Sequence, residues 1–273
     1  AVLRVDDRGA GKSSLGPDFK NRTSLDFSYD VETSLNYLEA RVDVDKKHLG
    51  LIGHSEGGEI APMVATRRKD VIFIVLWAGP ALMGAQISTE QSALEMKQQG
   101  VDSVSVAADS QLNLDILGLF KSSTTQEILD QKITPVFQAW KKEQSPKTLT
   151  ALNIGTGSAD DIAKTYDSSY NNGWIRFFMT YDPATTLAKV KCPVLAINGE
   201  KDTQVIAAEN LSRIKDVLTK SGNKDFETKE LPGLNHLLQT ATTGDVSEYE
   251  QIQETMSPPA LNIICSWIKL HTE

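Results

Sequence analysis

The chain has 273 residues, of which 40% are hydrophobic, enough for a large core. Its 36 acidic residues outnumber its 28 basic residues, and the net charge of −8 argues against a nucleic-acid groove or an anionic membrane as partner. The longest apolar run, at 71–85, is too short to span a membrane and contains a Gly-Pro break.

The first third of the chain alternates strands and helices. AVLRV at 1–5 predicts a strand, and the loop DDRGAGKSSLGP follows. A helix is predicted over 27–41, because its apolar residues fall on one stripe at Val31, Leu35 and Leu38. The next predicted elements are a strand at 47–52, a helix at 56–66 and a continuous apolar strand at 71–77. An uninterrupted apolar strand is typical of a parallel sheet covered on both faces.

This alternation stops at residue 84 and resumes after 188. The segment 84–188 is helix-like throughout and predicts a helical cap inserted into the sheet domain. Beyond it the sequence predicts a strand at 193–199, a helix at 207–220, a short strand at 226–231 and a last helix at 257–271. The expected fold is α/β, with a doubly wound, mostly parallel sheet formed by the discontinuous core 1–83 and 189–273.

The six residues GHSEGG at 53–58 follow a predicted strand and precede a predicted helix. In a G-x-S-x-G turn the serine stands at the tip of a sharp, strained strand-to-helix turn. Side chains at Gly53 and Gly57 would be expected to collide with the neighbouring strand and helix. Ser55 is therefore a candidate nucleophile, although the motif alone is also compatible with an ordinary tight turn.

A serine nucleophile needs a base, and the base needs a carboxylate that orients it. Among four histidines, His48 precedes the motif strand, His54 is expected to face away from the serine, and His271 lies near the C-terminus. His236, in LPGLNHLLQ after the last short strand, remains as the candidate base. In NGEKDTQV after the strand at 193–199, Asp202 is the preferred acid and Glu200 the alternative.

Together, LRVDDRGAGKS, GHSEGG, VLAINGEKDTQV and LPGLNH resemble the serine α/β-hydrolase superfamily, and within it the bacterial carboxylesterase branch of EstD-like acyl hydrolases. The resemblance covers both ends of the chain and matches the cap only loosely. It implies Ser55 as nucleophile, Asp202 as acid, His236 as base and the backbone N–H of Glu56 as an oxyanion-hole donor. It also implies that Asp7 and Arg8 brace the loop beside the active site.

The expected activity is hydrolysis of small carboxylic esters through an acyl-enzyme, without a metal or an organic cofactor. A thioesterase or small-peptide hydrolase with the same triad, and a non-catalytic binding protein, remain alternatives. The sequence does not decide the localisation; we expect a soluble bacterial protein that is cytoplasmic, periplasmic or secreted. In the cap, four aromatic residues at i, i+3, i+4 and i+7 are expected to share one helical face, as a substrate wall or as packing of the cap on the core: Trp174, Phe177, Phe178 and Tyr181.

Three further expectations concern the first residues and the cysteines. GAGKS is not a phosphate-binding loop, because Asp6 occupies the position of its first glycine. The family's sheet has a strand between those predicted at 1–5 and 47–52, so we expect an N-terminally incomplete core whose missing strand and second oxyanion donor precede Ala1. Cys192 and Cys265 have no metal or redox spacing and are expected to be buried small apolar residues.

Overall fold

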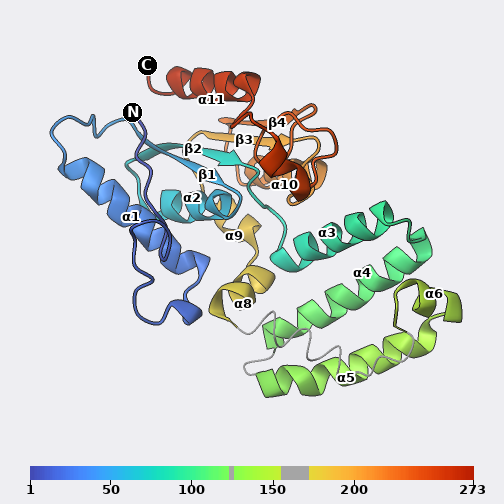
Figure 1. Cartoon of the computed structure of the whole chain (residues 1–273). Coiled ribbons are helices and arrows are strands. Elements are labelled where there is room, and N and C mark those ends of the chain that lie inside the picture. The colour runs from blue at the N-terminus through green and yellow to red at the C-terminus, as the bar shows by residue number, and fades with distance from the viewer. Residues whose placement is uncertain (123–125, 155–171) are drawn as a thin grey trace.

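The core of the protein is a four-stranded parallel sheet. The computed structural model describes residues 1–122, 126–154 and 172–273 (Figure 1). The strands pair in the order β1-β2-β3-β4, all parallel, which confirms the predicted mostly parallel sheet. Their bounds are Leu49–His54 for β1, Val71–Trp77 for β2, Val194–Gly199 for β3 and Phe226–Leu231 for β4.

Helices cover both faces of this sheet. Along β2, Ile74 and Leu76 pack into one hydrophobic cluster, whereas Phe73 and Val75 pack into another on the opposite face. The first cluster includes side chains of α1 (Ser24–Ala40), α2 (Glu56–Arg67) and α10 (Ala207–Lys220), and the second those of α11 (Pro258–Leu270). In Figure 1, α11 lies above the sheet and α1 and α2 lie below it. Burial on both faces explains why the central strand β2 reads as a continuous apolar run.

Most described helices of the predicted cap segment lie to one side of the sheet (Figure 1). Its described helices are α3 (Gly84–Gln98), α4 (Ser103–Gly118), α5 (Gln126–Glu143), α6 (Pro146–Ala151), α8 (Gly173–Thr180) and α9 (Pro183–Leu187). Most of them share a hydrophobic cluster separate from those of the sheet, with Ile116, Ile133 and Phe137 almost fully buried. The predicted segment also contains residues 123–125 and 155–171, which lie outside the described residues. Short 3-10 helices, η1 (Phe19–Asn21), η2 (Leu119–Ser122) and η3 (Val246–Gln251), complete the described elements.

The predicted strand at 1–5 is wrong. These residues form no regular structure and are exposed, and β1 pairs with β2 alone among the described residues. A strand forms only when a neighbour accepts its backbone hydrogen bonds, and residues 1–5 pair with no strand in the described part of the chain. Since β1 lies at an edge of the sheet, the expected additional strand beside it stays a prediction.

The structure also places the GAGKS loop and the two cysteines. Asp6 accepts a hydrogen bond from the backbone N–H of Lys12, so its carboxylate occupies the GAGKS loop. Arg8 pairs with Asp30 on α1, which braces the loop against that helix. Cys192 is partly buried, but Cys265 is exposed, contrary to prediction, because it lies on the outer side of α11.

Candidate active site

Ser55 stands at the turn between β1 and α2. Its φ of 53° and ψ of −118° lie outside the regions that non-glycine residues commonly adopt. Two backbone hydrogen bonds hold this conformation: the N–H of Ser55 donates to the carbonyl of Trp77 at 2.9 Å, and the N–H of Gly58 donates to the carbonyl of Ser55 at 2.7 Å. The predicted strand–turn–helix is therefore present, with a strained residue at its tip.

The glycines of this turn do not all serve the expected purpose. A Cβ atom at Gly53 would lie 1.9 Å from the carbonyl oxygen of Gly57, so Gly53 permits the tight turn as predicted. A Cβ atom at Gly57 would meet nothing within 4 Å, and the predicted collision there is wrong. The close approach occurs instead at Gly58, where a Cβ atom would lie 2.4 Å from the Cα of Gly79. The third glycine thus lets α2 pack against the loop after β2.

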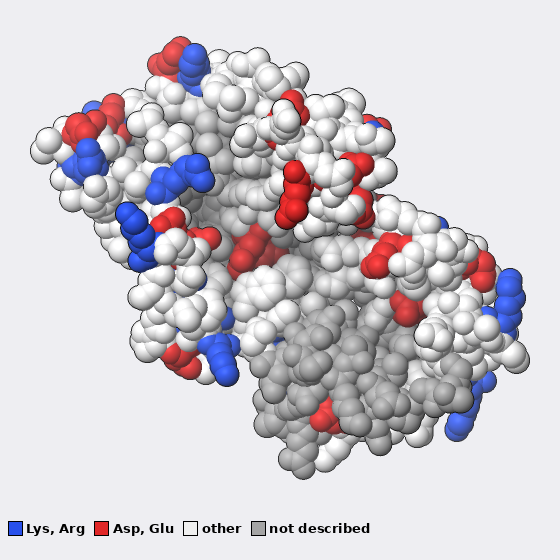
Figure 2. Space-filling view, viewed as in Figure 1, with Lys and Arg blue, Asp and Glu red and all other residues white. Residues whose placement is uncertain are grey.

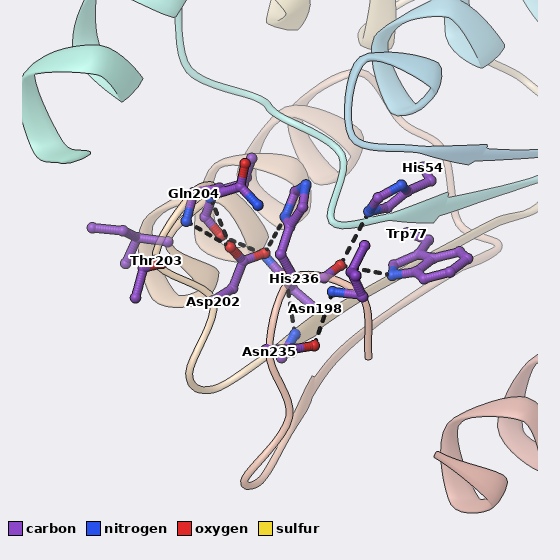
Figure 3. A network of polar contacts seen from close by, with 12 residues as sticks. His54, Trp77, Asn198, Asp202, Thr203, Gln204, Asn235 and His236 are labelled. Atoms are coloured by element: carbon purple, nitrogen blue, oxygen red, sulfur yellow. Dashed lines mark hydrogen bonds and ion pairs between the residues drawn. The ribbon is translucent and has the colours of Figure 1, made fainter. Parts of the chain in front are cut away.

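His236 and Asp202 form a buried hydrogen-bonded pair (Figure 3). His236 Nδ1 lies 2.8 Å from Asp202 Oδ2, and the two side chains are 4% and 0% exposed. The pair comes from loops that follow β3 and β4, at the same carboxyl edge of the sheet as Ser55. Because a carboxylate can only accept, the proton of the imidazole is on Nδ1, which leaves Nε2 as the basic nitrogen.

The second oxygen of the Asp202 side chain is held by the backbone. Oδ1 accepts the N–H groups of Gln204 and Val205 at 2.8 and 2.9 Å. Beside His236, the Asn235 side chain accepts the N–H groups of Leu237 and Gln239, which fixes the turn that carries the histidine. The alternative acid, Glu200, instead accepts the N–H of Gly233 at an exposed position. Asp202 is therefore the acid that contacts the histidine.

His54 and Trp77 are site residues that the sequence reasoning missed. His54 Nε2 and Trp77 Nε1 each lie 3.1 Å from the carbonyl oxygen of His236, so both donate to the same acceptor (Figure 3). The ring of His54 also lies against that of His236, with centroids 4.6 Å apart. Burial, and then the proximity of His236, lower the pKa of His54 to about 4, so the ring is a neutral donor. The sequence feature that could have identified both residues is their position at the ends of two adjacent parallel strands, β1 and β2.

Ser55 and Glu56 occupy the start of α2. Among the described residues, the Ser55 hydroxyl has no hydrogen-bond partner, His236 included. Hydrogen bonds between catalytic groups often tighten only when substrate is bound. Glu56 is the first residue of α2, where a backbone N–H has no acceptor within the helix. This N–H is therefore available to an oxyanion.

The four expected aromatic residues form two stacks rather than one face. Trp174 stacks on Phe178 with centroids 5.5 Å apart, and Phe177 stacks on Tyr181 with centroids 4.8 Å apart. Tyr181 has extended backbone at the end of α8 and donates to Thr186 at 2.6 Å, so it no longer follows the helical stripe. Burial raises the pKa of the Tyr181 phenol to about 12. Of the four, Trp174 is bonded to the Ser55 turn, through the Glu56 carboxylate.

One turn beyond Glu56, a second acid is buried in α2. Glu59 is 2% exposed, and one of its carboxyl oxygens has no partner among the described residues. Burial, and then the nearby Glu56, raise the pKa of Glu59 well above its ordinary value.

In the described part of the chain, no group of three or more His, Cys, Asp or Glu residues could hold a metal ion, and no helix is long and apolar enough to cross a membrane.

Comparison with known proteins relates this geometry to a fold. The family model described as "BAAT / Acyl-CoA thioester hydrolase C terminal" matches residues 25–150. No curated protein matches the sequence. Among solved structures, DcsB in complex with its substrate analogue is 16% identical, with a TM-score of 0.50 over 97% of this chain and 79% of that chain. The α/β hydrolase GrgF from Penicillium sp. sh18 is 14% identical, with a TM-score of 0.50 over 97% and 78%. At such identities the likeness concerns the fold alone, and it agrees with the sheet order and the strand–turn–helix at Ser55: this chain has the α/β-hydrolase fold.

Proposed function

We propose that the protein is a serine hydrolase that cleaves small carboxylic esters with Ser55, His236 and Asp202. The observation that carries the proposal is the buried hydrogen bond between His236 and Asp202, formed by loops at the same sheet edge as the strained Ser55 turn. A surface histidine needs no such orientation, whereas a general base does. An aspartate with both oxygens occupied, one by the imidazole and one by backbone N–H groups, is well held for that purpose.

In this mechanism, His236 Nε2 takes the proton of the Ser55 hydroxyl as Oγ attacks the ester carbonyl carbon. The negative charge moves to the carbonyl oxygen, which the N–H of Glu56 would stabilise. The intermediate collapses when the bond to the alcohol oxygen breaks and His236 returns the proton to that oxygen. His236 then takes a proton from a water molecule as the water oxygen attacks the acyl-Ser55 carbonyl carbon. When the bond between that carbon and Ser55 Oγ breaks, His236 returns the proton to Oγ, which releases the carboxylic acid and restores Ser55.

A thioester is the second candidate substrate class. It is favoured by the family model for acyl-CoA thioester hydrolases, whose match includes Ser55. The same triad cleaves both bonds, because only the leaving group differs. A different consideration concerns a polyanionic thioester: in Figure 2, acidic side chains lie within the central hollow and to its right, where they would repel phosphate groups, whereas basic side chains lie to its left.

The first test is labelling of the purified protein with a fluorophosphonate probe, together with hydrolysis of short-chain aryl esters. We expect labelling at Ser55 and ester turnover, and we expect Ser55→Ala to lose both. Equal turnover by Ser55→Ala would overturn the mechanism, and the absence of labelling in the wild type would favour a binding protein. Matched pairs of esters and thioesters with the same acyl group, with and without CoA phosphates, would then separate the two substrate classes.

A further inference from the structure

The side chain of Glu56 joins the nucleophile turn to two distant parts of the chain. Its Oε1 accepts the hydroxyl of Ser24 at 2.7 Å and the indole N–H of Trp174 at 2.7 Å. Ser24 is the first residue of α1, and Trp174 belongs to α8, within the predicted cap. We call this arrangement the Glu56 bridge. Glu56 and Trp174 are 118 residues apart in sequence, so the Glu56 bridge is a tertiary contact and not a feature of the local turn.

Both partners of Glu56 are themselves held in place. Ser24 is fully buried, and it follows Thr23, which caps α1 with a reciprocal pair of hydrogen bonds to Asp26. At the start of α8, a Cβ atom on Gly173 would lie 2.6 Å from the carbonyl oxygen of Asn21, so this end of the helix packs tightly on η1. The Glu56 bridge therefore connects two anchored elements, and its geometry is not that of a mobile surface contact.

The ring of Trp174 is fixed on its other side as well. It lies parallel to the ring of Phe178, with an interplanar angle of 3°, and Phe178 in turn covers Gly84 at the start of α3. A Cβ atom on Gly84 would lie 2.4 Å from Phe178 Cδ1. The indole is thus clamped between its hydrogen bond to Glu56 and an aromatic stack that leads into the other cap helices.

Trp174 contacts the side chain of the residue that follows the nucleophile. Consecutive Cα atoms are about 3.8 Å apart, and Glu56 directly follows Ser55. The indole is therefore separated from the backbone of Glu56 by the glutamate side chain and one hydrogen bond. A ring held in this way beside the nucleophile turn would be suited to bound an acyl or alcohol group.

We propose that Glu56 is a positioning residue that fixes the indole of Trp174 beside Ser55, and that the wall so formed sets the length of the acyl chain that the enzyme accepts. This inference rests on the proposed ester hydrolysis. It gives separate roles to two parts of one residue: the backbone N–H of Glu56 meets the oxyanion, and its carboxylate holds the wall. The acceptor oxygen is essential to this role and the negative charge is not.

The matched variants follow from that distinction. Glu56→Gln keeps an acceptor oxygen for Ser24 and Trp174, whereas Glu56→Met keeps only the length of the side chain. Trp174→Phe keeps an aromatic ring on Phe178 and removes the donor, and it remains informative if Glu56→Met folds poorly. As a control, Trp140→Phe removes a similar indole bond, to the carbonyl of Ala108, inside the cap.

The first readout is independent of catalysis. In ¹⁵N–¹H NMR spectra, Trp174→Phe assigns the indole N–H signal of Trp174. We expect this signal to shift upfield and to lose protection from hydrogen exchange in Glu56→Met, and to change little in Glu56→Gln. An unchanged signal in Glu56→Met would overturn the bridge, whether or not the protein is an esterase.

The second readout is the ratio of kcat/KM for butyrate and octanoate aryl esters. Loss of a hydrogen bond to a charged acceptor corresponds to about 10- to 100-fold, so we expect Glu56→Met and Trp174→Phe to shift this ratio at least about 10-fold in the same direction. The double variant should add little further, Glu56→Gln should restore most of the wild-type ratio, and Trp140→Phe should lower stability without changing the ratio. Equal losses of kcat/KM on both esters would refute the wall. A wild type that cleaves neither ester would refute both the wall and the proposed function, and the NMR result would still show whether the Glu56 bridge exists.

Discussion

Replacement of His54 with phenylalanine should destabilise the protein at neutral pH but not at acidic pH. At pH 7.5 the substitution removes one of two hydrogen bonds to the carbonyl of His236 and keeps an aromatic ring against Trp77, whose centroid lies 4.3 Å from that of His54. A buried hydrogen bond contributes about 0.5–1.5 kcal/mol, so the free energy of unfolding should fall by about 1 kcal/mol.

The pH dependence follows from the lowered pKa of His54. Its pKa is about 4 in the folded chain and 6.5 ordinarily, so between these values the unfolded chain binds a proton that the folded chain does not. Wild-type stability therefore falls as the pH drops from 6.5 to 4, by at most about 3 kcal/mol, and by roughly 1–2 kcal/mol once the partial exposure of the ring is considered. The phenylalanine variant lacks this loss, so its disadvantage should vanish or reverse near pH 4.5.

Urea unfolding at pH 7.5 and pH 4.5, followed by circular dichroism, measures both effects. Trp77→Phe is the matched control, because it removes the other donor to the same carbonyl without removing a titrating group. Its cost should be about 1 kcal/mol at both pH values. If His54→Phe is equally destabilising at pH 7.5 and pH 4.5, the ring of His54 is not a buried neutral donor and the reasoning fails.

Two further predictions test the acid and the turn. Asp202→Asn should lower kcat by about 10⁴-fold, because an amide favours the wrong tautomer of the histidine; Glu200→Gln should leave kcat close to the wild-type value, and steady-state kinetics that reversed this order would restore Glu200 as the acid. Gly57→Ala should raise the melting temperature slightly, since glycine costs roughly 0.5–1 kcal/mol relative to alanine in a helix. Gly58→Ala should lower it, because a Cβ atom 2.4 Å from the Cα of Gly79 costs about 1–3 kcal/mol; equal melting temperatures would contradict the packing.

The parts of the fold that were predictable are those in which local sequence and tertiary environment agree. VIFIVLW at 71–77 is apolar at every position, and the structure buries it between two layers as β2. The helix at 207–220 has a strong apolar stripe, and α10 has the same bounds. AVLRV at 1–5 also has strand-forming residues but remains irregular, because a strand also needs a paired neighbour and propensity does not supply one.

The candidate site divides in the same way. Chain order and placement after strands predicted His236 and Asp202 as partners, and their side chains meet at 2.8 Å, while their catalytic roles stay a prediction. The functions of His54 and Trp77 depend on a contact with a backbone carbonyl 182 and 159 residues away in sequence, and no local pattern encodes such a distance. For the cap, the four aromatic residues form two stacks instead of the predicted single face, Tyr181 lies beyond the end of α8, and their contact with a substrate stays a prediction.

The two variable positions of G-x-S-x-G have distinct structural roles in this chain. His54, before the nucleophile, donates to the backbone of His236, and Glu56, after it, accepts from the indole of Trp174. One turn therefore contacts both the loop of the proposed base and the helix that would bound the substrate. Because these contacts lead to two different parts of the chain, changes at residue 54 should act on both short and long esters alike, whereas changes at residue 56 should act on the ratio between them. The motif leaves both positions free in sequence, but the fold gives each a separate partner.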